Sequence, residues 1–277
     1  MRTGRPAPRG GKPDQRRAGG DPASGDSFLY GRNSAFEALA GRRRPKRLLV
    51  ADGVKEDERL HQLLSLAETR SVPVERIDRR QLDDLTGFAN HQGVCLVAGP
   101  YPYAPIDDLL QRQGTILVLD HLQDPQNFGT LLRAAESCGV AGVVMPADRA
   151  VDVTPAVVNA SAGAVEHLLV ARVANLPRAL GQAKSAGWWI IGLDRDERAV
   201  DLFSAALPQP AALVVGSEGA GLGSLVRRHC DLIAEIPMTG KVASLNAATA
   251  GSVALFELFR RSRTGPATTA PDQKSVP

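Results

Sequence analysis

The chain has 277 residues, which is enough for one large domain or two ordinary ones. Hydrophobic residues make up 43% and charged residues 23%, as in ordinary globular proteins, and no apolar run reaches the roughly 18 to 20 residues that cross a bilayer, so we expect no membrane partner. The N-terminus lacks the apolar stretch of a secretory signal. The chain has an odd number of cysteines, Cys95, Cys138 and Cys230, and they are widely spaced, so we expect reduced thiols and a cytoplasmic location. The same spacing argues against a disulfide framework and against a metal site.

Residues 1–27 form a basic tail. They hold six basic and three acidic residues, a difference that equals the whole net charge of +3. The segment is rich in glycine and proline and poor in large apolar side chains, so we expect it to be disordered. A loose basic arm suits a phosphate backbone, although a solubilising extension would have the same composition. Residues 264–277 are predicted to be disordered as well.

Ordered sequence is expected from residue 28, where a small alternating α/β domain begins. Asn33 is a suitable N-cap for a short helix that ends near Gly41. Strands and helices then alternate: a strand at KRLLVAD, a helix over 56–70 with leucines on one face, a strand at VPVERID, a short helix at RRQLDDLTG and a strand at GVCLVAGP. This domain covers residues 28–99, and prolines mark residues 100–113 as a linker.

Residues 114–263 are predicted to form a larger domain of alternating strands and helices. The continuous apolar strand TILVLD is of the kind that is buried on both faces of a sheet. Further strands are expected at GVVMP, HLLVARV, WWIIGLD, AALVVG and LIAEIP, and helices at 127–138, 154–165, 177–186, 222–229 and from Ser244 to about Arg261. This alternation predicts an α/β fold with a mostly parallel sheet covered by helices on both faces.

Three segments of this domain place small and polar residues directly after a strand, where ligands bind in open α/β sheets. The first, LDHLQDPQNFGTLLRAAESCG, contains Asn127 and, on one helical face, Arg133 and Glu136. A helix cap and a weak surface ion pair would also explain these residues.

The second segment, LVVGSEGAGLGS, surrounds Glu218 with glycines that would let a ligand approach the backbone closely. It does not have the GxGxxG spacing of a dinucleotide-binding turn. We interpret it as a nucleoside-binding loop of another kind, with a plain tight turn as the alternative.

The third segment, IPMTGKVASLNAATAGSVALFE, opens an apolar helix with small polar residues. Ser244 can cap this helix through its hydroxyl group. That role leaves Asn246 unexplained, because an asparagine in the first turn of an otherwise apolar helix favours a polar contact. We therefore expect Asn246 to point at a polar partner.

Together, DPQNFGTLLRAAESCG, GSEGAGL and IPMTGKVASLNAATA resemble, in order and spacing, the three motifs of the SpoU (TrmH-like) RNA ribose 2′-O-methyltransferases of the SPOUT superfamily. In the front domain, YGRNSAFEALAGRRRPKRLLVA and HQGVCLVAGP are similar to the RNA substrate-binding domain of the L30e type that is fused to some of these enzymes. The third motif departs from the common pattern at Ala248, where a second serine is frequent. The resemblance covers roughly residues 28–262.

This resemblance implies a SPOUT domain with a deep C-terminal trefoil knot and a homodimer with the active site at the interface. It implies that S-adenosylmethionine is the cofactor and that no metal is required. The residues that it assigns to cofactor binding are Gly216, Gly219, Gly221, Ile236, Met238 and Leu245.

The resemblance also implies a catalytic set, which comprises Asn127, Arg133, Glu218, Ser244 and Asn246. In the family, Arg133 is the proposed activator of the ribose hydroxyl group. Arginine is a poor general base, so Arg133 is either transiently neutral or stays charged and stabilises the developing alkoxide.

The function that this resemblance implies is methylation of a guanosine 2′-hydroxyl in large-subunit (23S) rRNA. We expect RNA, and not DNA, as the partner. The alternatives are a tRNA methyltransferase, an antibiotic-resistance rRNA methyltransferase, and a non-catalytic RNA-binding protein of ribosome assembly.

Overall fold

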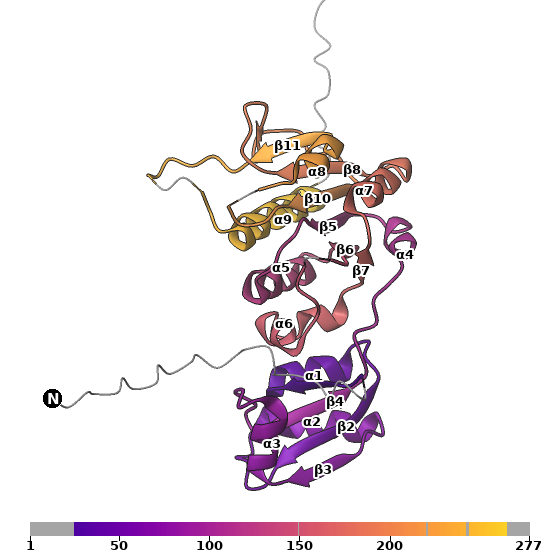
Figure 1. Ribbon diagram of the computed structural model, residues 1–277, viewed down its shortest axis with the longest axis vertical. Helices are drawn as coiled ribbons and strands as arrows, with labels where there is room; N and C mark the ends of the chain where they lie inside the picture. Colours follow the sequence, from indigo (N-terminus) through magenta and orange to yellow (C-terminus); the bar gives the residue numbers. More distant parts are fainter. Residues whose placement is uncertain (1–24, 149, 220, 242–243, 265–277) are drawn as a thin grey trace, which may run out of the picture.

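The structure is a computed structural model, and it describes residues 25–148, 150–219, 221–241 and 244–264. It contains two β-sheets, one in the N-terminal part of the chain and one in the C-terminal part, and the two parts lie end to end (Figure 1). The two predicted tails lie almost entirely outside the described residues. No helix in the described ranges has the length and apolar character that a membrane crossing requires.

The N-terminal domain is a four-stranded mixed sheet with helices. The sheet has the order β1-β4-β2-β3, in which β4 pairs antiparallel with β1 and β2 while β2 and β3 are parallel. Its elements are β1 (Ser27–Tyr30), α1 (Arg32–Ala40), β2 (Pro45–Ala51), α2 (Glu58–Thr69), β3 (Val74–Ile77), α3 (Arg79–Thr86) and β4 (Val94–Ala98).

Two details of this domain differ from the sequence prediction. Strand β1 was not predicted, because its four residues are too few to show a period. Asn33 is not a cap: Gly31 holds the N-cap position of α1, and the Asn33 side chain accepts a hydrogen bond from Arg59 Nε at 2.9 Å.

The C-terminal domain is built on a seven-stranded sheet in which every pair of neighbouring strands is parallel, as the alternation of strands and helices predicted. The strand order is β7-β6-β5-β10-β8-β11-β9. Its elements are α4 (Ile106–Leu110), β5 (Thr115–Leu119), α5 (Pro125–Ser137), β6 (Gly142–Pro146), α6 (Pro155–Ala160), the 3-10 helix η2 (Ala164–His167), β7 (Val170–Val173), α7 (Leu176–Ser185), β8 (Trp189–Leu193), β9 (Val200–Asp201), β10 (Ala211–Val215), α8 (Ser224–His229), β11 (Leu232–Glu235) and α9 (Ala247–Thr264).

Helices cover both faces of this sheet. On β5, Leu117 and Leu119 belong to the core that includes α5 and α9, while Ile116 and Val118 belong to a second core with α4, α7 and α8. This alternation explains why the strand is apolar at every position. The predicted linker is not a bare connection, since it contains α4, and the backbone N–H of Ala104 donates to Val170 O at 2.8 Å.

The strand order creates a switch point beside β5. Strands β6 and β7 extend the sheet on one side of β5, whereas β10, β8 and β11 lie on the other. Ligands of open α/β sheets bind outside the carboxyl ends of the strands at such a point. The second and third predicted segments follow β10 and β11 directly, so both begin at this edge.

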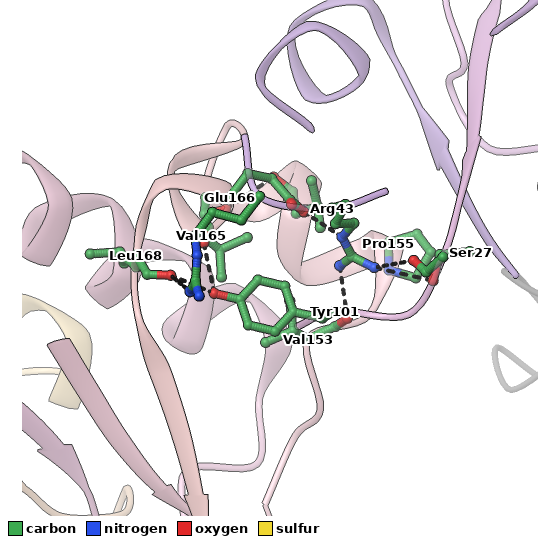
Figure 2. Close-up of polar contacts among 12 residues, drawn as sticks. Ser27, Arg43, Tyr101, Val153, Pro155, Val165, Glu166 and Leu168 are labelled. Atoms are coloured by element: carbon green, nitrogen blue, oxygen red, sulfur yellow. Dashed lines mark hydrogen bonds and ion pairs between the residues drawn. The ribbon is translucent and has the colours of Figure 1, made fainter. Parts of the chain in front are cut away.

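The two domains are joined by a buried ion pair. Arg43 follows α1, and its Nε donates to Glu166 Oε1 of η2 at 2.8 Å, with both side chains fully excluded from solvent. The guanidinium also donates to Ser27 Oγ at 3.2 Å and to the carbonyl of Val153 at 3.4 Å (Figure 2). A further hydrogen bond goes to the carbonyl of Gly99 at 3.4 Å. Burial raises the pKa of the Glu166 carboxyl, although Arg43 acts in the opposite direction.

Other contacts extend this joint on either side of the ion pair. The buried Tyr101 hydroxyl lies within hydrogen-bond distance of the carbonyls of Val165 and Leu168, at 3.0 and 2.8 Å (Figure 2). Ser34 Oγ donates to Asn159 Oδ1 at 3.0 Å, and Asn159 Nδ2 donates to Tyr30 O at 3.2 Å. One apolar core runs through both domains. The N-terminal domain is thus docked on α6 and η2.

Candidate active site

A cavity of about 500 Å³ opens at the carboxyl ends of β8, β10 and β11. Its wall contains all six residues predicted to bind a cofactor: Gly216, Gly219, Gly221, Ile236, Met238 and Leu245. It also contains Glu218, Ser244 and Asn246 of the predicted catalytic set. The second and third predicted segments therefore meet at one cavity, although they are far apart in the sequence.

The wall after β10 is a tight glycine-rich turn. Ser217 and Gly221 exchange two backbone hydrogen bonds, at 3.2 and 3.1 Å. Gly219 and Gly221 have φ values of +78° and +64°, a region that favours glycine. A Cβ atom on Gly216 would lie 2.3 Å from the backbone of Gly221. These glycines therefore allow a turn that presents backbone to the cavity.

Three polar side chains from separate segments converge beside the cavity. Glu218 Oε1 accepts hydrogen bonds from the side-chain amides of Asn127 and Asn246, the latter at 2.8 Å. Asn246 Nδ2 also donates to Asn127 Oδ1 at 3.0 Å. All three predicted segments thus contribute one member, and the polar partner expected for Asn246 is the pair Glu218 and Asn127.

The helix cap of α9 corrects one prediction. The helix begins at Ala247, and Asn246 Oδ1 accepts the backbone N–H groups of Ala248 and Thr249 at 2.9 and 3.1 Å. Asn246 is therefore the cap, and Ser244 lies before the helix in the cavity wall. The two ends of one amide group serve two roles: the oxygen caps α9, and the nitrogen reaches Glu218.

Arg133 stands apart from the other members of the predicted catalytic set. It lies on α5, like Asn127, but its side chain is exposed, and neither residue is part of the cavity wall. Among the residues that the structure describes, the Arg133 side chain makes no hydrogen bond or ion pair. Its guanidinium is thus available to a ligand outside the cavity.

The cavity wall also contains charged residues that the sequence reasoning missed. These are Asp194 and Arg195 after β8, and Glu235 at the end of β11. With Glu218, the wall carries three carboxylates against one guanidinium. Asp194 forms an ion pair with Arg227, and Glu235 lies 3.9 Å from Arg195, whereas Glu218 accepts hydrogen bonds from the neutral amides of Asn127 and Asn246. The Glu218 carboxylate therefore favours a ligand with positive charge. Asp194 is the last residue of the predicted strand WWIIGLD, where it reads as the polar end of a buried strand and not as a cavity residue.

The comparisons with known proteins agree on one family. Residues 114–256 match the SpoU rRNA Methylase family, and residues 28–104 match the family described as RNA 2′-O ribose methyltransferase substrate binding. The chain is 38% identical over 240 residues to YacO of Bacillus subtilis, which is assigned to the TrmH family of tRNA/rRNA methyltransferases; the match covers 84% of this chain and 95% of the relative. It is also 38% identical over 240 residues to slr0955 of Synechocystis, described as a tRNA/rRNA methyltransferase, of which it spans 62%.

Solved structures share the fold over both domains. An rRNA methyltransferase from Sinorhizobium meliloti with bound AdoMet has a TM-score of 0.73 and 25% identity, covering 86% of this chain and 88% of the other. The SpoU methyltransferase AviRb from Streptomyces viridochromogenes, also in complex with AdoMet, has a TM-score of 0.73 and 25% identity, covering 88% and 93%. The chain therefore belongs to the SpoU rRNA methylase family and is an RNA methyltransferase.

Proposed function

We propose that the enzyme transfers a methyl group from S-adenosylmethionine to the 2′-hydroxyl of a guanosine in large-subunit (23S) rRNA. The observation that carries this proposal is the convergence of three separate segments on one cavity, with Asn127, Glu218 and Asn246 hydrogen-bonded beside it. An RNA substrate of this kind implies that the protein acts in the cytoplasm.

The cavity fits the cofactor in size and charge. Its volume lies within the range of about 300–1,000 Å³ that is usual for small-molecule sites. When bound, S-adenosylmethionine supplies an electrophilic methyl group on a positively charged sulfur, which suits a wall that contains the Glu218 carboxylate, whose hydrogen-bond partners are the neutral amides of Asn127 and Asn246. Gly216, Gly219, Gly221, Ile236, Met238 and Leu245 would hold it.

The protein's own part in the reaction is positioning. Asn127, Glu218, Ser244 and Asn246 would orient the ribose so that its hydroxyl oxygen lines up with the methyl carbon and sulfur. Arg133, exposed on α5, would remain charged and stabilise the negative charge that develops on the ribose oxygen. A charged guanidinium can do this without acting as a base.

The N-terminal domain supports ribosomal RNA as the substrate. Residues 28–104 match a family of RNA substrate-binding domains, and this domain is docked on the catalytic one through a buried ion pair. Folded RNA is recognised by shape and by its 2′-hydroxyl groups. Two docked domains offer a longer surface to a folded RNA than the catalytic domain alone.

We also propose that the enzyme acts as a homodimer. Phe203 and Phe256 are 46% and 49% exposed, and together with Val253 they line a shallow hollow on α9. Phe256 belongs to α9 and Phe203 to the segment after β9, and exposed apolar patches of this kind mark interaction sites. A second copy of the chain would cover them.

The test is a methyl-transfer assay with the purified full-length chain. The protein and S-adenosylmethionine are incubated with unmodified large-subunit rRNA and, in parallel, with tRNA, and the digested nucleosides are analysed by mass spectrometry. The matched control is Asn246→Ala, which removes the amide that binds Glu218 and should transfer no methyl group.

We expect 2′-O-methylguanosine in the rRNA sample alone. Methylation of tRNA instead would keep the chemistry and contradict the proposed substrate. Transfer to neither RNA, repeated with precursor ribosomal particles, would argue for a non-catalytic RNA-binding protein.

A further inference from the structure

The glycine-rich loop at residues 216–219 and 221–223 forms one wall of the cavity, and its one buried apolar side chain among the described residues is Leu222, which belongs to the second core. Four of its positions are glycine, the residue that loses most conformational freedom when it is ordered. The exchange of hydrogen bonds between Ser217 and Gly221 closes the turn but does not attach it to the rest of the protein. Besides the buried Leu222 side chain, the loop backbone is attached by hydrogen bonds to two neighbouring segments.

Asp120 attaches the end of the loop from one side. It follows β5, which neighbours β10, and it is only 1% exposed. Its Oδ2 accepts the backbone N–H of Gly223 at 2.7 Å, and its Oδ1 lies 2.5 Å from His121 Nδ1. A carboxylate as buried as this one is costly unless both oxygens are hydrogen-bonded. The loop amide is thus part of what makes its burial possible.

Asp194 attaches the loop from the other side. It follows β8, the other neighbour of β10, and its Oδ2 accepts the backbone N–H of Leu222 at 3.0 Å. Its Oδ1 accepts the N–H of Arg195 at 2.7 Å. A Cβ atom on Gly221 would lie 2.7 Å from Asp194 Oδ2, so glycine at this position lets the carboxylate reach the backbone.

Arg227 on α8 holds Asp194 in turn. Its Nη2 donates to Asp194 Oδ2, and its Nη1 donates to Asp196 Oδ2 at 2.7 Å. The N–H of Arg198 and the guanidinium of Arg227 hold the pKa of the Asp196 carboxyl below its usual range. Arg227 therefore links the segment after β8 to α8, and Asp194 in this segment contacts the loop.

We propose that Asp120 and Asp194 are positioning residues that clamp the glycine loop from both neighbouring strands, through the consecutive N–H groups of Leu222 and Gly223, and so fix its cofactor-binding shape before the cofactor arrives. Because the loop also carries Glu218, the same clamp sets the contact of Glu218 with Asn127 and Asn246. The proposal rests on the proposed function, since it takes S-adenosylmethionine as the ligand.

Asp120 gives the cleaner test of the two. Asp194 lies in the cavity wall, so its loss would also remove a direct ligand contact, whereas Asp120 does not line the cavity. An effect of Asp120 on cofactor affinity must therefore pass through the loop. Asp120→Asn keeps an oxygen acceptor for Gly223, while Asp120→Ala removes it.

The experiment measures binding of S-adenosylmethionine and S-adenosylhomocysteine by calorimetry, and amide hydrogen exchange of residues 216–223 in the cofactor-free protein. The variants are Asp120→Ala, Asp120→Asn and Asp194→Ala. The control is Asp231→Ala, because Asp231 Oδ2 also accepts a backbone N–H, that of Ile190 at 2.9 Å. Asp231 directly precedes β11 and Ile190 lies near the start of β8, so this contact is at the opposite edge of the sheet from the cavity. Circular dichroism checks that each variant is folded.

In the wild type we expect the Leu222 and Gly223 amides to be protected without cofactor. Asp120→Ala and Asp194→Ala should each lose that protection and bind the cofactor at least about tenfold more weakly, because the loop must then be ordered on binding. Asp120→Asn should bind within about threefold of the wild type. Asp231→Ala should leave both cofactor affinity and exchange of the loop unchanged.

Two results would contradict the proposed clamp. The first is fast amide exchange of Leu222 and Gly223 in the cofactor-free wild type, and the second is wild-type cofactor affinity in folded Asp120→Ala and Asp194→Ala. The first of these needs no variant to fold. Failure of the proposed function looks different, because the wild-type protein itself would then bind neither S-adenosylmethionine nor S-adenosylhomocysteine.

Discussion

Arg133 is an exposed cation on the helix that also carries Asn127, but it lies outside the cavity wall. If its role is to stabilise charge on the ribose oxygen, Arg133→Ala should lower kcat by roughly 10²–10³-fold, as removal of one oxyanion-stabilising donor does. The affinity for S-adenosylmethionine should stay within about twofold, because no change is made to the cavity wall. Single-turnover methyl transfer and calorimetry measure the two quantities.

The control for this prediction is Arg178→Ala. Arg178 is an exposed arginine on α7, which covers the opposite face of the sheet from α5. Its loss removes the same charge without touching the proposed site, so turnover should be unchanged. A fully active Arg133→Ala enzyme would remove Arg133 from the mechanism.

At the scale of residues, the sequence revealed those site residues that are unusual in their own segment. Glu218 stands among glycines and Asn246 at the start of an apolar helix, and the structure brings these two together with Asn127. Asp120 and Asp194 gave no such signal, because each reads as the polar end of a buried strand. Only the strand order β5-β10-β8 places them on either side of the glycine loop.

The close packing of α5 against α6 depends on Gly129. A Cβ atom on Gly129 would lie 2.3 Å from Ala160 Cβ and 2.7 Å from the Ala160 backbone, so α5 and α6 pack at backbone contact. Gly129→Ala should therefore lower the free energy of unfolding by about 1–3 kcal/mol, the usual cost of overpacking. Chemical denaturation of the folded variant measures this change.

The matched control is Gly181→Ala in α7, where an added Cβ would meet no atom within 4 Å. Here the gain in helix propensity should raise the free energy of unfolding by up to about 1 kcal/mol. The same substitution thus acts in opposite directions at the two sites. Equal stabilisation at both would show that α5 and α6 are not in close contact.

The elements that could be predicted are those with a long apolar run. Six of the seven parallel strands show it, and the parallel sheet follows from their alternation with helices. Strand β9 has two residues and β1 has four, so neither shows a pattern. The start of α9 was misplaced because serine and asparagine are equally good caps. Only the structure distinguishes Ser244 from Asn246.

The contact between the two domains is made by residues from both of them, so no local pattern in either half of the sequence predicts it. In the run RRRPKR, the five basic residues look alike, yet Arg43 alone is fully buried, against a glutamate more than a hundred residues away. The trefoil knot likewise stays a prediction from the family resemblance. A docked N-terminal domain would present RNA to the site at a fixed distance.

The buried ion pair of Arg43 and Glu166 should make a measurable contribution to the stability of the protein. Removing one partner leaves the other charge buried and unpaired, so Arg43→Met and Glu166→Met should each lower the free energy of unfolding by about 3–5 kcal/mol. The double variant leaves neither charge, and it should lose clearly less than the sum of the two single changes. Urea denaturation of the four proteins gives the coupling energy.

The exposed pair Arg47 and Glu75 supplies the comparison. Their atoms are 3.4 Å apart, and both side chains are nearly half exposed, at 48% and 45%. The same cycle of methionine substitutions should give a coupling of at most about 1 kcal/mol there, because solvent screens the pair. A coupling at Arg43 and Glu166 as small as this would mean that the joint opens in solution. The N-terminal domain would then carry RNA to the active site on a flexible linker, and not from a fixed position.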